Sequence, residues 1–199
     1  MVPPRIHNTA LVESDDIGQG TAIWAFVHVM KGAHIGANCN IGDNCFVESG
    51  VIVGDNVTLK NSNMLFEGLV LEEGVFVGPH VFFTNDRYPR SPRLPEAASR
   101  YHDKSWLVST RVERGASLGA AAVLIAGVTI GKYAMVGAGS VVSKDVAPHA
   151  LVIGAPAHRV GWVCRCGEKL NVQNNTADCK TCGDRYVIEG EMIRRLELS

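Results

Sequence analysis

The chain has 199 residues, a net charge of −1 and 46% apolar residues. This length allows one main domain with a small appendage. The near-neutral charge and the lack of a long basic run argue against nucleic acid or an anionic membrane as the main partner. We find no signal-peptide pattern and no apolar stretch long enough to span a bilayer, so we expect a cytoplasmic protein without a membrane partner.

Apolar residues recur at every sixth position near the start of the chain. With nearly half of the residues apolar, an unbroken run of this length would arise by chance in roughly one chain in several thousand. A period of six is typical of a parallel β-helix, in which each hexapeptide supplies one short strand and one corner. The twelve residues are Ile17, Ile23, Val29, Ile35, Ile41, Val47, Val53, Leu59, Leu65, Leu71, Val77 and Phe83.

A second, smaller residue follows each apolar one by four positions, and we expect it to point inward as well. Cys39 and Cys45 fall at this position, where a thiol behaves as a compact apolar group. Asn63 also falls there and therefore needs a buried hydrogen-bond partner. The glycine that often follows the apolar residue suits a corner with positive φ or close backbone approach. The register returns from Val112 to Val142, so about six coils of three hexapeptides are predicted.

The segment 84–111 interrupts the period, because the 29 steps from Phe83 to Val112 are not a multiple of six. It is rich in proline and charge, as expected of a loop that leaves a regular solenoid. Long insertions in compact domains are often functional, and insertions in solenoids collect on the binding face.

The predicted β-helix domain covers residues 1–160, and a segment of different composition follows at 161–199. This tail contains the sequences CRCGEKL and CKTCGDRY, separated by twelve residues. Cys164, Cys166, Cys179 and Cys182 thus form two pairs, which predicts tetrahedral coordination of a structural Zn²⁺ ion. Free thiols and an iron–sulfur centre remain as alternatives. So small a unit would owe most of its folding free energy to the metal.

Residues 17–162 resemble the nucleotide-sugar N-acetyltransferases, especially those that acetylate a 3-amino group on UDP- or dTDP-linked sugars, such as the UDP-2-acetamido-3-amino-2,3-dideoxyglucuronate N-acetyltransferases. The discriminating motifs are the FTN-x-x-x-PRS loop and the ending GAGSVV-x-KDV followed by GAPA. The resemblance implies a left-handed β-helix, a homotrimer with active sites between subunits, and acetyl-CoA along the coil surface. It places CoA against the backbone near Ala120 and Ala138. Lys144 and Arg159 are cations near the end of the predicted β-helix and are candidate contacts to the phosphates of CoA.

The start of the insertion reads FFTND, with Asn85 at the place where several related O-acetyltransferases have a catalytic histidine. A neutral amine is nucleophilic without a strong base, whereas an alcohol is not, so this substitution favours N-acetylation. Asn85 would orient the amine or the thioester, although it could simply start a turn. Glu67 is a candidate for steering the amine.

Three further residues are candidates for substrate binding: His28, Tyr88 and Arg90. Each could equally be an ordinary surface or loop residue. Ala121 replaces an asparagine that is common in the family, which puts one contact to CoA in doubt.

Three other functions remain open. A γ-carbonic anhydrase would need three histidines from adjacent coils, and coils 112–147 contain none. An O-acetyltransferase, or a transferase of another acyl group, would keep the fold and change the substrate. A non-catalytic scaffold would use the tail as a protein-binding module.

Overall fold

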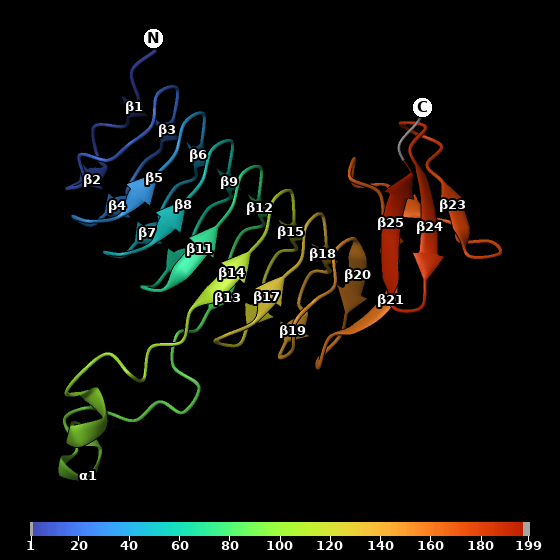
Figure 1. The fold of residues 1–199 in the computed structure, drawn as a ribbon. Helices are drawn as coiled ribbons and strands as arrows, with labels where there is room; N and C mark the ends of the chain where they lie inside the picture. Colours follow the sequence, from blue (N-terminus) through green and yellow to red (C-terminus); the bar gives the residue numbers. More distant parts are fainter. Residues whose placement is uncertain (1, 197–199) are drawn as a thin grey trace.

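The computed structural model describes residues 2–196, and their fold is a solenoid of three parallel sheets followed by a small antiparallel sheet (Figure 1). Sheet A consists of β1 (Arg5–Ile6), β3 (Ala22–Ile23), β6 (Asn40–Ile41), β9 (Thr58–Leu59), β12 (Phe76–Val77), β15 (Ser117–Leu118), β18 (Met135–Val136), β20 (Ala150–Ile153), β21 (His158–Val163) and β22 (Lys169–Leu170). Sheet B consists of β2 (Leu11–Val12), β4 (His28–Val29), β7 (Phe46–Val47), β10 (Met64–Leu65), β13 (Phe82–Phe83), β16 (Val123–Leu124) and β19 (Val141–Val142). Sheet C consists of β5 (His34–Ile35), β8 (Ile52–Val53), β11 (Leu69–Leu71), β14 (Thr110–Val112) and β17 (Thr129–Ile130).

Strands of one sheet pair in register with strands one coil away, as Ile23 does with Ile41 and Ile41 with Leu59. The apolar residues of the six-residue period point into the solenoid and are buried from Ile23 onward. The smaller residues four positions later are buried too, including Cys39 and Cys45. The prediction of an all-β, mostly parallel β-helix is therefore confirmed. Its core is a stack of aliphatic layers along the whole solenoid axis.

The glycines that follow the apolar residues are needed for close backbone approach. A β-carbon built on Gly36 would lie 2.6 Å from the carbonyl carbon of Gly54 on the next coil. Positive φ values occur two residues further on, as at Gly50 (+79°) and Gly68 (+88°). Of the two explanations offered by the sequence, close approach is the correct one.

Asn63 is fully buried in the core and has the partners that its position demands. Its Nδ2 donates to the carbonyl oxygens of Lys60 (2.6 Å) and Gly78 (3.0 Å). Its Oδ1 accepts from the backbone N–H of Val81 (2.9 Å). The bonds to Gly78 and Val81 tie consecutive coils together, and all three bonds offset the cost of burying an amide.

The insertion leaves the solenoid after β13, at the corner between sheets B and C, and projects from it in Figure 1. It contains one turn of helix, α1 (Pro95–Ala98), and the 3₁₀ helix η1 (Ser99–Tyr101). Thr110 and Arg111 already pair with β11, so the insertion ends two residues earlier than the spacing predicts.

Asp86 anchors the base of the insertion. It forms an ion pair with Arg100 and accepts hydrogen bonds from Tyr101 Oη (2.7 Å) and the backbone N–H of Tyr88 (2.9 Å). Burial would raise the pKa of Asp86, but these two hydrogen bonds and the Arg100 charge lower it below its usual value.

After the last coil, β20 turns back through β21 as an antiparallel pair, so the expected boundary at residue 160 falls inside a strand. The chain then forms sheet D from β23 (Thr176–Asp178), β24 (Arg185–Glu189) and β25 (Met192–Leu196). We call residues 164–196 the tail from here on. No helix within residues 2–196 is both long and apolar enough to cross a bilayer.

Candidate active site

The structure brings Asn85 and Glu67 together. Glu67 lies at the corner between β10 and β11, and Asn85 lies one coil away, where the insertion begins. Asn85 Nδ2 donates to the backbone carbonyl of Glu67 (3.3 Å), and the backbone carbonyl of Asn85 accepts from Val108 (2.9 Å). Phe66, Asn85 and Val108 line a small crevice at this corner. The Asn85 amide therefore lies against the backbone of Glu67, whereas the Glu67 carboxylate points towards Gly50 on the preceding coil.

The Glu67 carboxylate is bound by the insertion itself. Lys104 Nζ lies 2.6 Å from Oε1 and 2.8 Å from Oε2 of Glu67. A second carboxylate lies nearby, because Glu48 Oε2 accepts the backbone N–H of Glu67 (2.8 Å). The corner therefore presents negative charge and currently holds one ammonium group.

Tyr88 and Arg90 lie on the insertion, and both are exposed. Tyr88 lines a hollow of about 290 Å³ together with Arg87, Arg100 and Trp106. Val108 lines both this hollow and the crevice at Asn85, so the two are adjacent. The side chain of Arg90 bonds only to the neighbouring carbonyl of Pro89 among the described residues.

His28 does not join this group within one chain. It lies on the outer face of β4 and contacts Glu13 Oε2 (3.3 Å) and the edge of the Phe46 ring (5.5 Å between centroids). Three strand spacings separate β4 from β13 in sheet B, or about 14 Å.

The residues expected near acetyl-CoA fall into two groups. Ala120 and Ala138 are exposed at the same corner of successive coils, where Gly139 N–H donates to the Ala120 carbonyl (2.8 Å). Lys144 and Arg159 line one hollow of about 320 Å³ at the end of the solenoid. Arg159 stacks on Trp162 (4.4 Å) and donates to the Glu191 carbonyl (3.1 Å).

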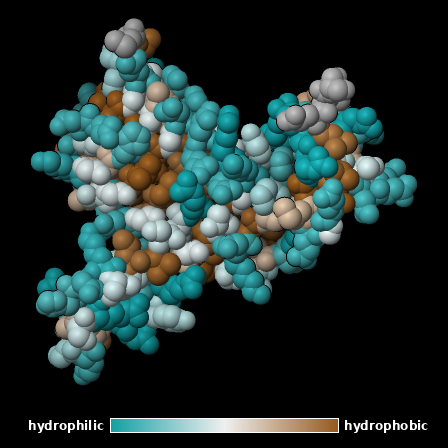
Figure 2. Space-filling view, viewed as in Figure 1, coloured by the Kyte–Doolittle hydropathy of each residue, from teal (hydrophilic) through white to brown (hydrophobic). Residues whose placement is uncertain are grey.

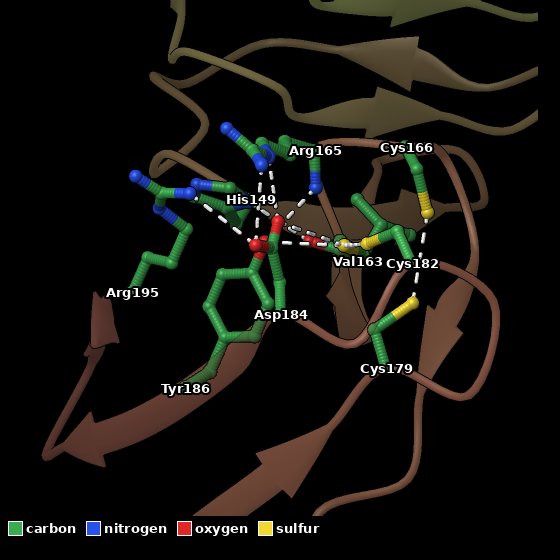
Figure 3. A network of polar contacts seen from close by, with 10 residues as sticks. His149, Val163, Arg165, Cys166, Cys179, Cys182, Asp184, Tyr186 and Arg195 are labelled. Carbon is green, nitrogen blue, oxygen red and sulfur yellow. Dashed lines mark hydrogen bonds and ion pairs between the residues drawn. The ribbon is translucent and has the colours of Figure 1, made fainter. Parts of the chain in front are cut away.

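The four cysteines of the tail converge, with their sulfur atoms all within 4.8 Å of one another (Figure 3). Cys164 lies 3.4 Å from Cys182 and Cys166 lies 3.6 Å from Cys179. Tetrahedral Zn–S bonds of about 2.3 Å imply sulfur separations of about 3.8 Å, so the spacing fits this ion. The pKa of Cys179 is lowered to about 7, mainly by the backbone N–H of Cys182, whereas the pKa values of the thiols of Cys164, Cys166 and Cys182 are raised.

Charged and aromatic groups surround these sulfurs. Asp184 is buried and paired with Arg165 (2.6 Å) and Arg195 (3.2 Å). The Tyr186 hydroxyl lies 3.2 Å from Cys164 Sγ, and its ring packs edge-on against His149 (5.3 Å) of the last coil. The tail is thereby joined to the solenoid through side chains that hold the thiols in place.

A known protein is similar to this chain along nearly its full length. The chain is 47% identical over 191 residues to dTDP-3-amino-3,6-dideoxy-α-D-galactopyranose 3-N-acetyltransferase of Aneurinibacillus thermoaerophilus, covering 96% of this chain and 94% of the relative. Family models match at residues 16–49, as bacterial transferase hexapeptide (six repeats), and at 109–144, as the hexapeptide repeat of succinyl-transferase. The chain belongs to the hexapeptide-repeat acetyltransferases.

Other members of the family match more weakly. Galactoside O-acetyltransferase of Lactococcus lactis is 34% identical over 109 residues, covering 52% of this acetyltransferase and 47% of the relative. A solved hexapeptide-repeat acetyltransferase from Vibrio cholerae, complexed with acetyl coenzyme A, has a TM-score of 0.54 at 24% identity, covering 66% of this chain and 70% of the other. The last similarity concerns the fold alone.

The sequence pattern did not indicate Lys104, Glu48 or the residues around the thiols as parts of a site. Lys104 contacts Glu67 across 37 positions from a segment without any repeat, so no register could have paired them. The position of Glu48 near this corner could have been predicted, because the six-residue register places Glu48 one coil before Phe66 at the equivalent position.

Proposed function

We propose that this acetyltransferase transfers the acetyl group of acetyl-CoA to the amino group at C3 of a dTDP-linked amino sugar. The observation that carries the proposal is the 47% identity over 94% of the length of an enzyme named for that reaction. The corner geometry supports it independently, because it offers an amide and a carboxylate that can position an amine.

In the reaction we propose, the neutral amine nitrogen attacks the carbonyl carbon of the thioester. A C–N bond forms, the C–S bond breaks and the CoA thiolate leaves. The surplus proton on nitrogen passes to solvent or to the departing thiolate. Asn85 orients the amine or the thioester carbonyl, Glu67 attracts the substrate's ammonium group, and Tyr88 and Arg90 contact the nucleotide-sugar.

We assign acetyl-CoA to the outer surface of the later coils, along Ala120 and Ala138. Small side chains at this corner leave the backbone accessible. Lys144 and Arg159 line one hollow at the end of the solenoid, and we assign to them the cations that the phosphates of CoA need.

A homotrimer with a left-handed solenoid is the assembly that we propose. The trimer and the left-handed turn are what the family resemblance implies, and association of subunits is supported by an apolar ladder on the outer face of sheet B, where Leu11 is 55% and Phe82 56% exposed. Phe46, Met64, Val123 and Val141 continue this ladder, and an apolar strip of such length favours burial against another chain. In such an assembly His28, which lies on the ladder, would face a neighbouring subunit and could reach its substrate. Light scattering that finds a fully active monomer would contradict this arrangement.

We further propose that the C-terminal segment predicted from the sequence, residues 161–199, binds one Zn²⁺ ion through four cysteines of the tail, Cys164, Cys166, Cys179 and Cys182. Reduced thiolate ligands suit the cytoplasm, where we place the enzyme. The ion would have a structural role.

The experiment that tests the function measures acetyl-CoA turnover with a panel of nucleotide-linked sugars. We expect turnover with dTDP-linked 3-amino sugars and none with the matched 3-hydroxy sugars. Turnover of a galactoside or a 3-hydroxy sugar alone would favour O-acetylation, which the partial match to galactoside O-acetyltransferase makes the second candidate.

Within one chain, a base for O-acetylation close to Asn85 would have to come from the insertion. Its one histidine, His102, is exposed after η1 and is placed by a backbone hydrogen bond to Ser99. We expect His102→Ala to retain amine acetylation, whereas its loss would contradict direct attack without a base.

A further inference from the structure

The ion pair between Glu67 and Lys104 occupies the carboxylate to which we assign the attraction of the substrate's ammonium group. Both Glu67 oxygens contact the same ammonium group, at 2.6 and 2.8 Å. An amino sugar at neutral pH carries an ammonium group of the same charge and hydrogen-bonding capacity. Two such groups compete for one carboxylate.

The insertion is built to hold Lys104 at this corner. The turn after it is closed by Leu107 N–H donating to the Lys104 carbonyl (3.0 Å). Leu107 packs over Gly68, next to Glu67, at 3.5 Å from where a β-carbon would stand. Lys104 is thus delivered by a segment that is itself packed against the corner.

The pair is nevertheless easy to exchange. The Lys104 side chain is 68% exposed and that of Glu67 29% exposed, and exposed ion pairs contribute little to stability. Moving Lys104 away costs nothing in the solenoid core. A ligand can therefore displace Lys104 without unfolding its surroundings.

We propose that Lys104 is a positioning residue that occupies the amine subsite at Glu67 until the amino sugar displaces it, and then stays beside the amine. This inference rests on the proposed function and identifies how that site treats its substrate. A carboxylate pair formed by Glu67 and Glu48 alone would hold the substrate as a non-nucleophilic ammonium. The adjacent positive charge of Lys104 favours the neutral amine, which is the form that attacks.

Few charged groups surround this subsite, so the effect of the Lys104 charge on the protonation of the substrate's amine can be measured separately. Glu48 faces it from the preceding coil and Lys104 from the insertion, whereas Arg87 lies near Gly127, two coils after Glu67. Asp103, next to Lys104, is turned to the backbone N–H of Ser105 (2.9 Å). Lys104 is the group in direct contact with Glu67.

The test compares Lys104→Met with wild type after wild-type turnover of a dTDP-3-amino sugar has been established. We expect KM for the amino sugar to fall about two- to fivefold at neutral pH, because the competitor is gone. We expect the rising limb of kcat against pH to move up by about half a unit, so that kcat is lower at neutral pH and recovers at higher pH. Lys104→Arg should restore both parameters.

Two controls keep the result specific. Lys31→Met removes the same charge at the equivalent corner two coils earlier and should change neither parameter. The KM for acetyl-CoA should be unchanged in every variant, as it would not be if the insertion had lost its fold. A higher or unchanged KM for the amino sugar, or an unmoved pH profile, would overturn the proposal. Absence of turnover in wild type would instead reject the proposed function.

Discussion

The solenoid and the tail are stabilised in different ways. Each coil of the solenoid buries fresh aliphatic side chains, and residues such as Ile35, Leu71 and Leu118 have no exposed surface. The tail buries few apolar side chains, chiefly Leu170, Tyr186 and Ile188, around its cluster of thiols.

The insertion differs from both regions, because Figure 2 shows mostly hydrophilic residues on its surface.

The difference shows how stability is distributed along this chain. Contacts within the solenoid are repeated from coil to coil, so a change in one layer is felt mainly by its neighbours. The tail is organised around one cluster of thiols, so a substitution in that cluster should affect the whole tail. The predictions below use this contrast, beginning with the largest expected effect.

Replacing Cys182 by Ser should abolish stoichiometric zinc binding and disorder the tail while the solenoid stays folded. Metal ions supply most of the folding free energy of such small units. Metal analysis and hydrogen exchange would measure both effects. Replacement of Cys45, a core thiol, by Ala is the matched control and should leave one zinc per chain. Protein purified without chelator that contains no zinc would contradict the assignment.

Replacing Leu71 by Ala should lower the free energy of unfolding of the solenoid by about 2–5 kcal/mol, because a fully buried side chain is lost and a cavity remains. Urea denaturation would measure this loss. Ile52→Ala, on the outer face of the neighbouring strand and 47% exposed, should cost far less. Equal losses of unfolding free energy in the two variants would show that the buried aliphatic layers do not stabilise the solenoid more than its outer face does.

Replacing Asn63 by Val should cost about 1–3 kcal/mol, since the backbone groups of Lys60, Gly78 and Val81 lose a buried partner. The reciprocal change Val57→Asn puts an amide at the same position of the preceding hexapeptide, where no partners have been arranged. It should destabilise the fold at least as much. Stability unchanged by Asn63→Val would mean that water replaces the amide.

The insertion should lose order in acid. The pKa of Asp86 is lowered in the fold, so its contribution to stability is complete above its unfolded pKa, about 4, and is lost as the pH falls through the lower folded value. Asp86→Asn should increase hydrogen exchange of residues 86–109 at neutral pH, with a cost of about 1 kcal/mol. Asp103→Asn, at an exposed position in the same loop, is the control. Equal exchange in both variants would contradict the anchoring role of Asp86.

Periodicity made most of the solenoid predictable. The six-residue register placed each inward side chain, including the odd Asn63, and the paired cysteines located the thiol cluster. The insertion was predictable only in its existence, because its contacts follow no repeat. The pairing of Lys104 with Glu67, and the anchoring of Asp86 by Arg100 and Tyr101, depend on a loop conformation that local pattern does not encode. For His28, the register predicts that the side chain lies on the outer face of its strand, but it does not predict whether that side chain belongs to a substrate site.

The central claim is that the corner at which the insertion leaves the solenoid acetylates an amine. The most direct test is kcat/KM of Asn85→Ala with acetyl-CoA and a dTDP-linked 3-amino sugar, beside Asn171→Ala, an exposed asparagine of the tail, as the control. Loss of a positioning or oxyanion contact predicts a decrease of roughly one to three orders of magnitude in Asn85→Ala alone. A near-normal rate in that variant, or efficient acetylation of the 3-hydroxy analogue by wild type, would contradict the account.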